Sequence, residues 1–488
     1  MTIKDLKPKN VWSIFEQITK VPRPSGHLDK IREWLVNFAK ENNLEYKVDN
    51  VGNVAIFRPA APGFENAKGV VLQGHMDMVA EKAATSKHNF LTDPIETIVD
   101  GEWLNANNTT LGADDGIGVA MALAVLTDKD LKCGPLEALV TVDEETGLTG
   151  ALGMTKEMLQ GSYLLNLDSE DDGIITMGCA GGVVSCITLD YTPQEAPADL
   201  TYFEIKIGKL HGGHSGSDIH LGYACATKQI ARLLYRLGKE IDFELASLNA
   251  GNLHNAIAHE GTAVVGVKAA DKEKLAVIVN QFKADIEGEY KNIEKEIEIS
   301  CHSTDKPAQI IDKDTATRVI EALFAAPHGV SAMCHDIDDL VQTSTNLACV
   351  KTLADKKEIY IEQFTRSSIE SQKFELAHQI EATYKLAGAR EVREEGSYQG
   401  WEPNLDNHIL KVAVESWEKL YGVKPIVNAI HAGLECGLFM KVRPDMDMIS
   451  YGPTLQNVHS PKERCHIPAV QKAWDFTIDI LKQVAAGK

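Results

Sequence analysis

Short apolar segments that end in acidic or histidine residues recur along the first part of this chain. The segment 69–79 (GVVLQGHMDMV) is Val-rich, which is typical of a buried strand, and we expect the strand to break at Gly74 into a polar turn. The segments 136–142 (LEALVTV) and 163–167 (YLLNL) are also apolar, and each leads directly into acidic residues. Because helical runs such as 119–126 (VAMALAVL) alternate with these strands, the pattern predicts an α/β fold.

Ligands of an α/β sheet gather outside the carboxyl ends of its strands, so residues that follow the strands are candidates for one shared site. Two histidines and several carboxylates occupy such positions. They offer nitrogen and oxygen ligands without the thiolates of a structural zinc site, which suits Zn²⁺, Mn²⁺ or Co²⁺. This donor set predicts a two-metal hydrolase site rather than a redox centre. The candidates are His75, Asp77, Asp114, Glu144, Glu145, Asp168 and His459.

The histidines and the first aspartates each have a simpler alternative. His75 and Asp77 could form a surface turn, or His75 could bind a metal while Asp77 fixes its tautomer through the other ring nitrogen. Asp114 and Asp115 could cap the following helix, or Asp114 could span two cations about 3.5–4 Å apart with its two oxygens. His459, in YGPTLQNVHSP, is by itself typical of a surface loop. Only its combination with the other candidates favours a role for it as a metal ligand.

The remaining candidates follow two predicted strands. Glu144 and Glu145 are adjacent, so their side chains can take different roles, one as a ligand and the other as a general base that passes its proton to a leaving amine. An exposed acidic turn is the alternative for this pair. Asp168 follows its apolar run directly, whereas the acidic residues at 170–172 suit a solvated loop. Position therefore favours Asp168 as the functional residue.

The bulk properties argue against several other classes of protein. A chain of 488 residues has room for two or three domains, and it contains no run of about 18 apolar residues that could span a membrane. The net charge of −21 argues against a nucleic-acid partner, because binding a phosphate backbone needs a basic face. The N-terminal segment lacks the features of a secretory signal, and none of the nine cysteines forms a CxxC pair, so we expect a cytoplasmic protein with reduced thiols.

The distance of His459 from the other candidates along the chain predicts a discontinuous catalytic domain. The sequence pattern changes near residue 200, where the period-2 strand FEIKIGK is followed by the loop HGGHSG and a charged stretch over 271–297. This pattern is typical of a separate α+β layer. If His459 joins the site, the C-terminal region returns to the first domain. We therefore expect a catalytic domain of residues 1–182 plus 397–488 and an inserted domain of residues 183–396.

A series of motifs resembles one known family across nearly the whole chain. In order they are GHMDMV, LGADDGIG, TVDEETGLTGA, LNLDSE, HGGHSG, HAGLECG and the terminal HSP. They look like the M20 family of metallopeptidases. The resemblance implies a mixed-sheet, zinc-peptidase-like catalytic domain with an inserted α+β lid or dimerisation domain. It also implies hydrolysis of dipeptides with a free N-terminus, including Xaa-His and carnosine-like dipeptides, by a metal-bridged water that a glutamate activates.

The same resemblance implies a role for each candidate of the metal site. Two divalent ions are expected per subunit, with zinc preferred over cobalt or manganese. Glu144 is the general base, Asp77 orients the first histidine, and the Asp114–Asp115 peptide is expected to be cis. The implied ligands are His75, Asp114 and Asp168 for one ion, and Asp114, Glu145 and His459 for the other.

The lid domain is expected to contribute three further residues. His214 in HGGHSG is implied to stabilise the oxyanion of the scissile carbonyl, in its own subunit or in the partner of a homodimer. Asn255 and Arg366 are implied to bind the substrate, and Arg366 suits bidentate capture of a free carboxylate. His211, in the same loop as His214, is a second candidate for the oxyanion role.

One departure and two rival functions accompany this interpretation. Many family members have Lys-Gly after the two aspartates, whereas this chain has Gly116 and Ile117. The same metal core serves amidohydrolases that act on N-acyl or N-carbamoyl amino acids, and a metal-dependent binding protein could retain the fold. Glu144 beside a full ligand set speaks against the binding protein. The role of Glu435 in HAGLECG is left open.

Overall fold

The computed structural model describes residues 2–487, which divide into two compact units. The first unit is discontinuous along the chain, because two later segments return to it. It contains the chain up to Cys179, the segment Trp401–Ala429 and the chain from Leu434 onward, and the second unit contains Ala180–Gly400 and Ile430–Gly433.

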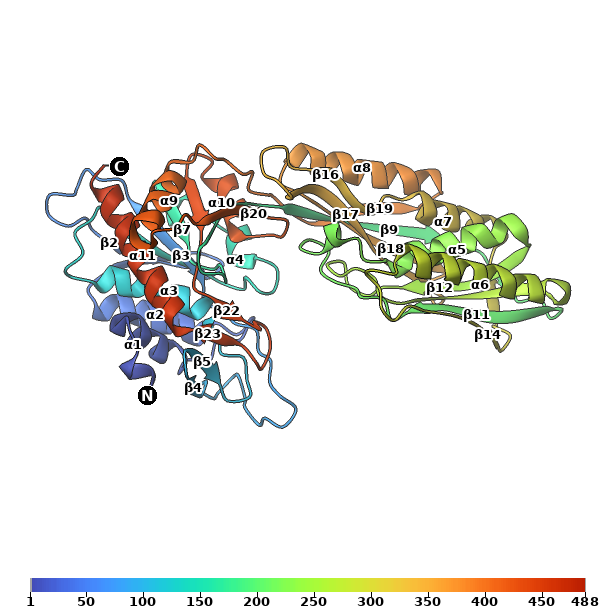
Figure 1. Cartoon of the computed structure of the whole chain (residues 1–488), viewed down its shortest axis with the longest axis horizontal. Helices are drawn as coiled ribbons and strands as arrows, with labels where there is room; N and C mark the ends of the chain where they lie inside the picture. Colours follow the sequence, from blue (N-terminus) through green and yellow to red (C-terminus); the bar gives the residue numbers. More distant parts are fainter. Residues whose placement is uncertain (1, 488) are drawn as a thin grey trace. The chain divides into compact units, whose positions relative to one another are not determined.

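An eight-stranded mixed sheet forms the centre of the first unit (Figure 1). Its order is β1-β2-β6-β3-β7-β21-β8-β20, with β3 parallel to both β6 and β7 and with β7 parallel to β21. The strands β3, β6 and β7 are buried along their whole length, which explains their continuous apolar sequences. The bounds are β1 Glu45–Val48, β2 Val54–Arg58, β3 Val70–His75, β6 Leu136–Thr141, β7 Tyr163–Asn166, β8 Ile174–Cys179, β20 Ile426–Ile430 and β21 Asp447–Ser450.

Helices and a smaller sheet complete the first unit. Helix α3 (Ala113–Thr127) contacts β3 and β6, and its Ala-rich sequence is apolar on nearly every side because the helix is buried almost throughout. The other helices are α1 Lys9–Ile18, α2 Asp29–Glu41, α4 Thr149–Leu152, α9 His408–Tyr421, α10 Glu435–Val442 and α11 Ile467–Ala485. The smaller sheet has the order β22-β23-β5-β4, with β4 Thr97–Asp100, β5 Trp103–Ala106, β22 Leu455–Gln456 and β23 Arg464–His466.

Two boundaries near the predicted site differ from the sequence prediction. The predicted break at Gly74 is wrong, because β3 continues through Gly74 to His75. A side chain on Gly74 would collide with Oδ2 of Asp115, so this glycine makes room for a buried carboxylate instead of ending the strand. Helix α3 includes Asp114 and Asp115, but their backbone angles are not helical, so the regular helix begins after them.

The second unit is an antiparallel sheet covered by helices. The sheet has the order β14-β11-β13-β12-β17-β18-β9-β19, with β16 paired to β17, and alternate residues such as Val265 and Val267 of β13 enter an apolar core shared with Leu233 and Phe282. The charged stretch 271–297 forms mainly helix α6. The helices are α5 Ala226–Glu240, α6 Lys272–Glu289, α7 Lys313–Ala325 and α8 Glu370–Leu386.

A mixed α/β sheet in one unit and an α+β arrangement in the other confirm the predicted fold class. Among residues 2–487, no helix has the length and apolar character that crossing a bilayer requires.

The strands of the second unit are β9 Gly181–Asp190, β10 Pro193–Glu195, β11 Leu200–Gly208, β12 Phe243–Ala250, β13 Gly261–Lys268, β14 Glu298–Thr304, β15 Gln309–Ile311, β16 Gly329–Met333, β17 Val341–Leu353, β18 Glu358–Ser367 and β19 Glu391–Tyr398.

Candidate metal centre

Three neighbouring parallel strands carry candidate ligands to one edge of the sheet in the first unit. Strand β3 ends at His75, which is paired in register with Thr141 at the end of β6. Glu144 and Glu145 follow β6, and Asp168 follows β7, the other parallel neighbour of β3. Because the strands are parallel and in register, their carboxyl ends lie level, and the turns that follow them lie close together.

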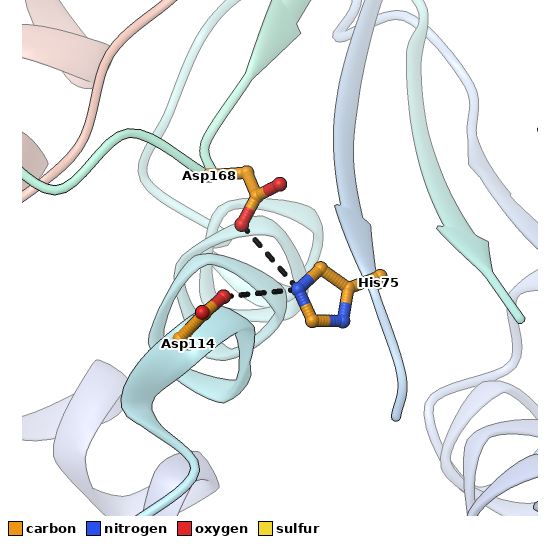
Figure 2. Close-up of side chains that lie close together, drawn as sticks. All are labelled: His75, Asp114 and Asp168. Atoms are coloured by element: carbon orange, nitrogen blue, oxygen red, sulfur yellow. Dashed lines mark hydrogen bonds and ion pairs between the residues drawn. The ribbon is translucent and has the colours of Figure 1, made fainter. Parts of the chain in front are cut away.

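His75, Asp114 and Asp168 form a first group (Figure 2). Nε2 of His75 lies 3.0 Å from Oδ1 of Asp114 and 3.4 Å from Oδ1 of Asp168. The side chain of His75 is 1% exposed, so the group is closed to solvent on the histidine side. One nitrogen and two carboxylate oxygens therefore converge on one point, as ligands do around a single cation.

His459, Asp114 and Glu145 form a second group. Nε2 of His459, in the loop between β22 and β23, lies 3.0 Å from Oδ2 of Asp114 and 3.0 Å from Oε2 of Glu145. Asp114 directs one oxygen toward His75 and the other toward His459. Its carboxylate thus lies between the two groups, where a bridging ligand would be, and the Asp114–Asp115 peptide is cis as the resemblance implied.

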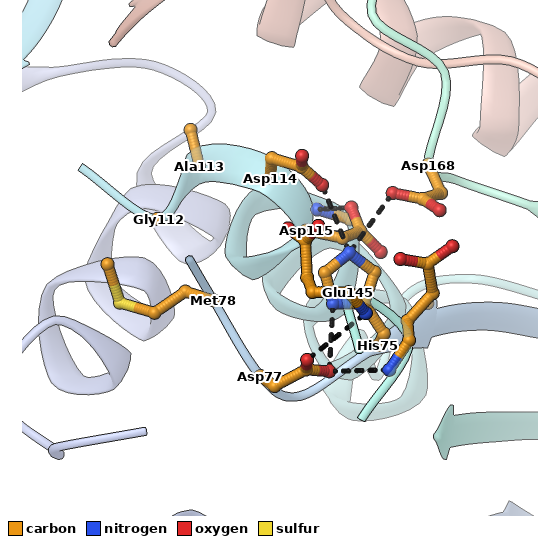
Figure 3. Close-up of polar contacts among 12 residues, drawn as sticks. His75, Asp77, Met78, Gly112, Ala113, Asp114, Asp115, Glu145 and Asp168 are labelled. Atoms are coloured by element: carbon orange, nitrogen blue, oxygen red, sulfur yellow. Dashed lines mark hydrogen bonds and ion pairs between the residues drawn. The ribbon is translucent and has the colours of Figure 1, made fainter. Parts of the chain in front are cut away.

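Asp77 connects the first histidine with the two glutamates, and Figure 3 shows it beside His75 and Glu145. Its Oδ1 lies 3.3 Å from Nδ1 of His75, so this ring nitrogen faces a carboxylate, although not with the alignment of a direct hydrogen bond. The backbone N–H groups of Glu144 and Glu145 donate to the two oxygens of Asp77 over 3.1 and 3.3 Å, and the hydroxyl of Ser25 donates to Asp77 over 2.8 Å. Asp77 thereby leaves Nε2 as the nitrogen of His75 that faces the first group.

The cluster has an excess of negative charge in a largely buried position. Burial lowers the pKa of His75, but the charges and hydrogen bonds of Asp168 and Asp114 outweigh it and raise that pKa well above its usual range. Hydrogen bonds to Asp114 and Glu145 raise the pKa of His459 to about 11. The carboxylates therefore favour positive charge on both imidazoles, and bound divalent cations would neutralise the same excess of negative charge.

The residues fit divalent cations on two further grounds. Oε1 of Glu145 is buried without a hydrogen-bond partner among the described residues, and such an oxygen is costly unless a cation binds it. In each group the potential ligand atoms lie within 4.8 Å of one another. Beside these groups, burial raises the pKa of Glu144 well above its usual value, so this carboxyl group can hold a proton.

Within the second unit, the side chains of His214 and Arg366 are in contact. Nδ1 of His214 lies 3.3 and 3.1 Å from the backbone N–H groups of Gly216 and Ser217. Burial and the charge of Arg366 lower the pKa of His214, which favours the neutral ring. Nε2 of His214 lies 3.3 Å from Nη2 of Arg366, and the guanidinium can only be the donor in this contact.

Arg366 is 4% exposed, yet it forms no ion pair with a carboxylate of residues 2–487. Its guanidinium donates to the hydroxyl of Tyr398 over 3.0 Å and lies over the ring of Phe364, 4.3 Å from the centroid. A buried arginine without a carboxylate partner can accept one from a ligand.

The other two predicted residues of this unit lie differently. His211 stacks on Tyr223, with ring centroids 4.0 Å apart, whereas His214 pairs with Arg366. Asn255 is exposed, and its backbone carbonyl accepts the N–H of Ser215 in the His214 loop over 2.8 Å.

The motifs of the chain agree with a known family model. The model of peptidase family M20/M25/M40 matches residues 71–483. The chain belongs to this family.

Several known proteins match this chain over nearly its whole length. The cytosol non-specific dipeptidase of Escherichia coli (strain K12) is 39% identical over 487 residues, which cover 99% of each protein. The crystal structure of aminoacylhistidine dipeptidase from Vibrio alginolyticus shares 40% identity with a TM-score of 0.91, over 99% of this chain and 98% of that one. A tripeptidase from Staphylococcus aureus, with 16% identity and a TM-score of 0.56 over 99% of each chain, shares the fold.

The sequence prediction missed two buried charges beside the M20 site. Arg23 and Glu463 are each 2% exposed, and both bind the backbone just before Asp114. The one available signal for Glu463 is its position four residues after His459, and VPRPSG gives none for Arg23. A Cβ on Gly116 would lie 2.5 Å from Nη2 of Arg23, so a larger residue at this position would displace the guanidinium.

Glu435, whose role the sequence left open, contacts the sheet that supports the M20 site. Its Oε2 accepts the amide N–H of Gln73 over 2.6 Å and the hydroxyl of Thr141 over 2.8 Å. These partners lie on β3 and β6, directly below the strand ends that lead to the candidate ligands. Burial raises the pKa of Glu435 to about 8.

Proposed function

We propose that this protein is a dinuclear metallo-dipeptidase that hydrolyses dipeptides with a free N-terminus, Xaa-His dipeptides among them. The position of Asp114, with one carboxylate oxygen toward His75 and the other toward His459, carries the proposal. The printed names of two relatives, a non-specific dipeptidase and an aminoacylhistidine dipeptidase, support the substrate class.

The proposed site holds two divalent ions, with zinc preferred over cobalt or manganese. Its donors are neutral imidazole nitrogens and carboxylate oxygens, which suit these ions better than Ca²⁺ or Cu⁺. When bound, the ions supply Lewis acidity, which makes a water molecule more acidic and polarises the scissile carbonyl. The proposed ligands are His75, Asp114 and Asp168 for one ion, and Asp114, Glu145 and His459 for the other.

Glu144 moves the proton in the proposed reaction. Its carboxylate takes a proton from the attacking water, whose oxygen bonds to the carbonyl carbon of the peptide. The C–N bond then breaks, and the carboxyl group of Glu144 returns the proton to the leaving amine. Asp77 holds the backbone of Glu144 and faces Nδ1 of His75, so it supports both the base and a ligand.

The second unit is proposed to bind the substrate. His214 would donate Nε2–H to the carbonyl oxygen as negative charge develops there, and Arg366 would bind the C-terminal carboxylate of the dipeptide. Asn255 is proposed to contact the substrate as well. Buried Arg366, without a carboxylate of its own among the described residues, is the main support for carboxylate recognition.

The proposal includes a domain assignment and a cellular location. Residues 1–182 and 397–488 form the catalytic domain, and residues 183–396 form a lid or dimerisation domain of a homodimer. A cytoplasmic location is supported by the name of the Escherichia coli relative, a cytosol dipeptidase.

A substrate panel on protein reconstituted with Zn²⁺, Mn²⁺ or Co²⁺ tests the proposal. We expect turnover of Xaa-His and other free dipeptides and no comparable turnover of N-acetyl or N-carbamoyl amino acids. Preferential hydrolysis of the N-acylated compounds would make the protein a deacylase. Absence of all turnover despite bound metal would leave it a binding protein.

A further inference from the structure

Arg23 and Glu463 enclose the peptide group that leads into Asp114. The carboxylate of Glu463 accepts three consecutive backbone N–H groups, those of Leu111 and Gly112 at Oε2 over 2.7 and 2.9 Å and that of Ala113 at Oε1 over 2.7 Å. The N–H of Asp114 lies 3.4 Å from Oε1 as well.

Arg23 binds the opposite side of the same segment and joins it to β3. Its Nη2 donates to the carbonyl of Gly112, and its Nη1 donates to the carbonyls of Met76 and Asp77 over 3.0 and 2.6 Å. Met76 and Asp77 directly follow His75, so one guanidinium fixes both the strand end and the loop before Asp114. Figure 3 shows Gly112 and Ala113 leading into Asp114 beside the segment from His75 to Met78.

Glu463 adds a third segment to this arrangement. It lies four residues after His459, and it precedes β23, which pairs with β5. The loop between His459 and Glu463 is held by its own hydrogen bonds, including that of the Glu463 N–H to the carbonyl of Ser460 over 3.0 Å. The position of His459 is therefore tied to the backbone of Asp114 through one carboxylate.

The local geometry favours glycine at position 112. Gly112 has a φ of +68°, and a Cβ there would lie 2.6 Å from Nη2 of Arg23, so a larger residue would be strained and would displace the guanidinium. Arg23 forms no ion pair with a carboxylate of residues 2–487, so its donors serve backbone carbonyls. Two opposite charges buried this deeply are costly unless each is held by hydrogen bonds, as both are.

We propose that Arg23 and Glu463 are a pair of positioning residues that set the distance between Asp114 and the two histidines, His75 and His459, and thereby the affinity for the two metal ions. The inference rests on the proposed metal site, and neither residue touches metal or substrate. Partners that orient metal ligands typically change metal affinity by about 10- to 100-fold when they are replaced.

Two substitutions and two matched controls test the pair. Glu463→Gln presents an amide N–H where Oε1 or Oε2 accepts, and Arg23→Lys cannot reach three carbonyls with one ammonium group. Glu137→Gln changes another buried carboxylate that accepts a backbone N–H in the same unit, that of Gln160 over 2.9 Å. Arg443→Lys changes another buried arginine that donates to a backbone carbonyl, that of Leu159.

The measurements are Co²⁺ titrations followed by visible absorption, circular dichroism of the metal-free proteins, and kcat and KM on a dipeptide. We expect Glu463→Gln and Arg23→Lys to fold, to bind Co²⁺ about 10- to 100-fold more weakly with an altered absorption band, and to lose kcat with little change in KM. The two controls should keep the affinity and spectrum of the wild type. Glu463→Asp, which retains a carboxylate, should recover part of the affinity.

Wild-type Co²⁺ affinity and spectrum in Glu463→Gln and Arg23→Lys would overturn the inference, and so would an equal loss in the controls. If Glu463→Gln does not fold without metal, Glu463→Asp and Arg23→Lys decide the question by the same titration. Failure of the proposed function is distinguishable: wild-type protein that binds two Co²⁺ ions but hydrolyses no dipeptide overturns the function and leaves the titrations valid. Wild-type protein that binds no Co²⁺ overturns both.

Discussion

The backbone N–H of Glu144 donates to Oδ1 of Asp77 over 3.1 Å, and the same oxygen faces Nδ1 of His75 over 3.3 Å. One carboxylate therefore sets the direction of a candidate ligand and the backbone of the candidate base. Movement of either residue would disturb the other, which links ligand geometry to proton transfer.

Replacing Glu144 by Gln should separate these two roles. Gln preserves the shape and the backbone hydrogen bond to Asp77 but cannot take a proton, so we expect kcat to fall by about 10²- to 10⁴-fold while both metal ions stay bound. Steady-state kinetics with metal analysis of the same sample measures this. Asp143→Asn is the matched control in the same turn, because Asn keeps the oxygen that accepts the Gly26 N–H over 2.6 Å. Near-normal turnover of Glu144→Gln would mean that another group is the base.

Removal of the metal ions should lower both activity and stability. A ligand at about 1,000 times its Kd stabilises the native state by about 4 kcal/mol, so chelation should lower Tm, and added Zn²⁺ should restore it. Asp114→Asn should reduce the number of bound ions, because an amide cannot bridge two cations as a carboxylate does. Asp128→Asn, at the other end of α3, should retain both ions. An Asp114→Asn variant with two tightly bound ions would contradict the bridging role.

Arg366→Lys tests recognition of the dipeptide carboxylate. Lysine lacks the planar pair of donors, so kcat/KM on a free dipeptide should fall by the equivalent of about 2 kcal/mol, whereas the dipeptide amide should lose little. Arg390→Lys, an exposed arginine of the same unit that pairs with Asp190 and Glu358, serves as the control. Equal losses on the dipeptide and its amide would assign Arg366 a purely structural role.

Glu137 should make the native state less stable as pH rises. Burial raises its pKa from 4.5 to about 7, so the folded protein keeps a proton that the unfolded chain releases between these values. The free energy of unfolding thus falls by about 1.4 kcal/mol per pH unit as pH rises from 4.5 to 7. Above pH 7 it stays about 3 kcal/mol lower. Denaturation of Glu137→Gln against the wild type measures this. The variant should be more stable at pH 8, with the gain disappearing near pH 4.5, and a gain that is independent of pH would refute the cause.

Gly74→Ala should destabilise the first unit although alanine is normally tolerated in a strand. Its Cβ would meet the buried carboxylate of Asp115, and overpacking of this kind costs about 1–3 kcal/mol. Gly69→Ala, immediately before the same strand, would make only ordinary contacts, the nearest at 3.4 Å, and is the control. Urea denaturation of the metal-free variants compares them. Equal stability of the two variants would show that Asp115 can move without cost.

Local sequence patterns predicted the parts of the site that follow strands. His75 and Asp168 could be found because a continuous apolar run, buried on both faces, ends at or just before each of them. The same strand-end pattern does not account for Asp114 and His459, because Asp114 lies at the start of α3 and His459 lies in the loop between β22 and β23. The predicted break at Gly74 is wrong because the role of this glycine depends on Asp115, a residue 41 positions later that no local pattern connects with it.

Residues that act on the backbone of other segments escaped prediction for the same physical reason. Glu463 accepts N–H groups some 350 positions earlier in the chain, and periodicity carries no information about such a contact. Arg23 lies between two prolines, where a charged residue normally suggests an exposed turn, yet it is buried against the loop before Asp114.

The contact between Asp114 and His459 spans 345 residues, and this imposes an order on protein synthesis. At about 5–20 residues per second, Asp114 leaves the ribosome on the order of tens of seconds before the histidine that faces its second oxygen. During that interval the nascent chain presents an acidic cluster with a single imidazole. The group of His459, Asp114 and Glu145 is therefore completed last, after the inserted unit has had time to fold. A translation product that ends before His459 would lack this group.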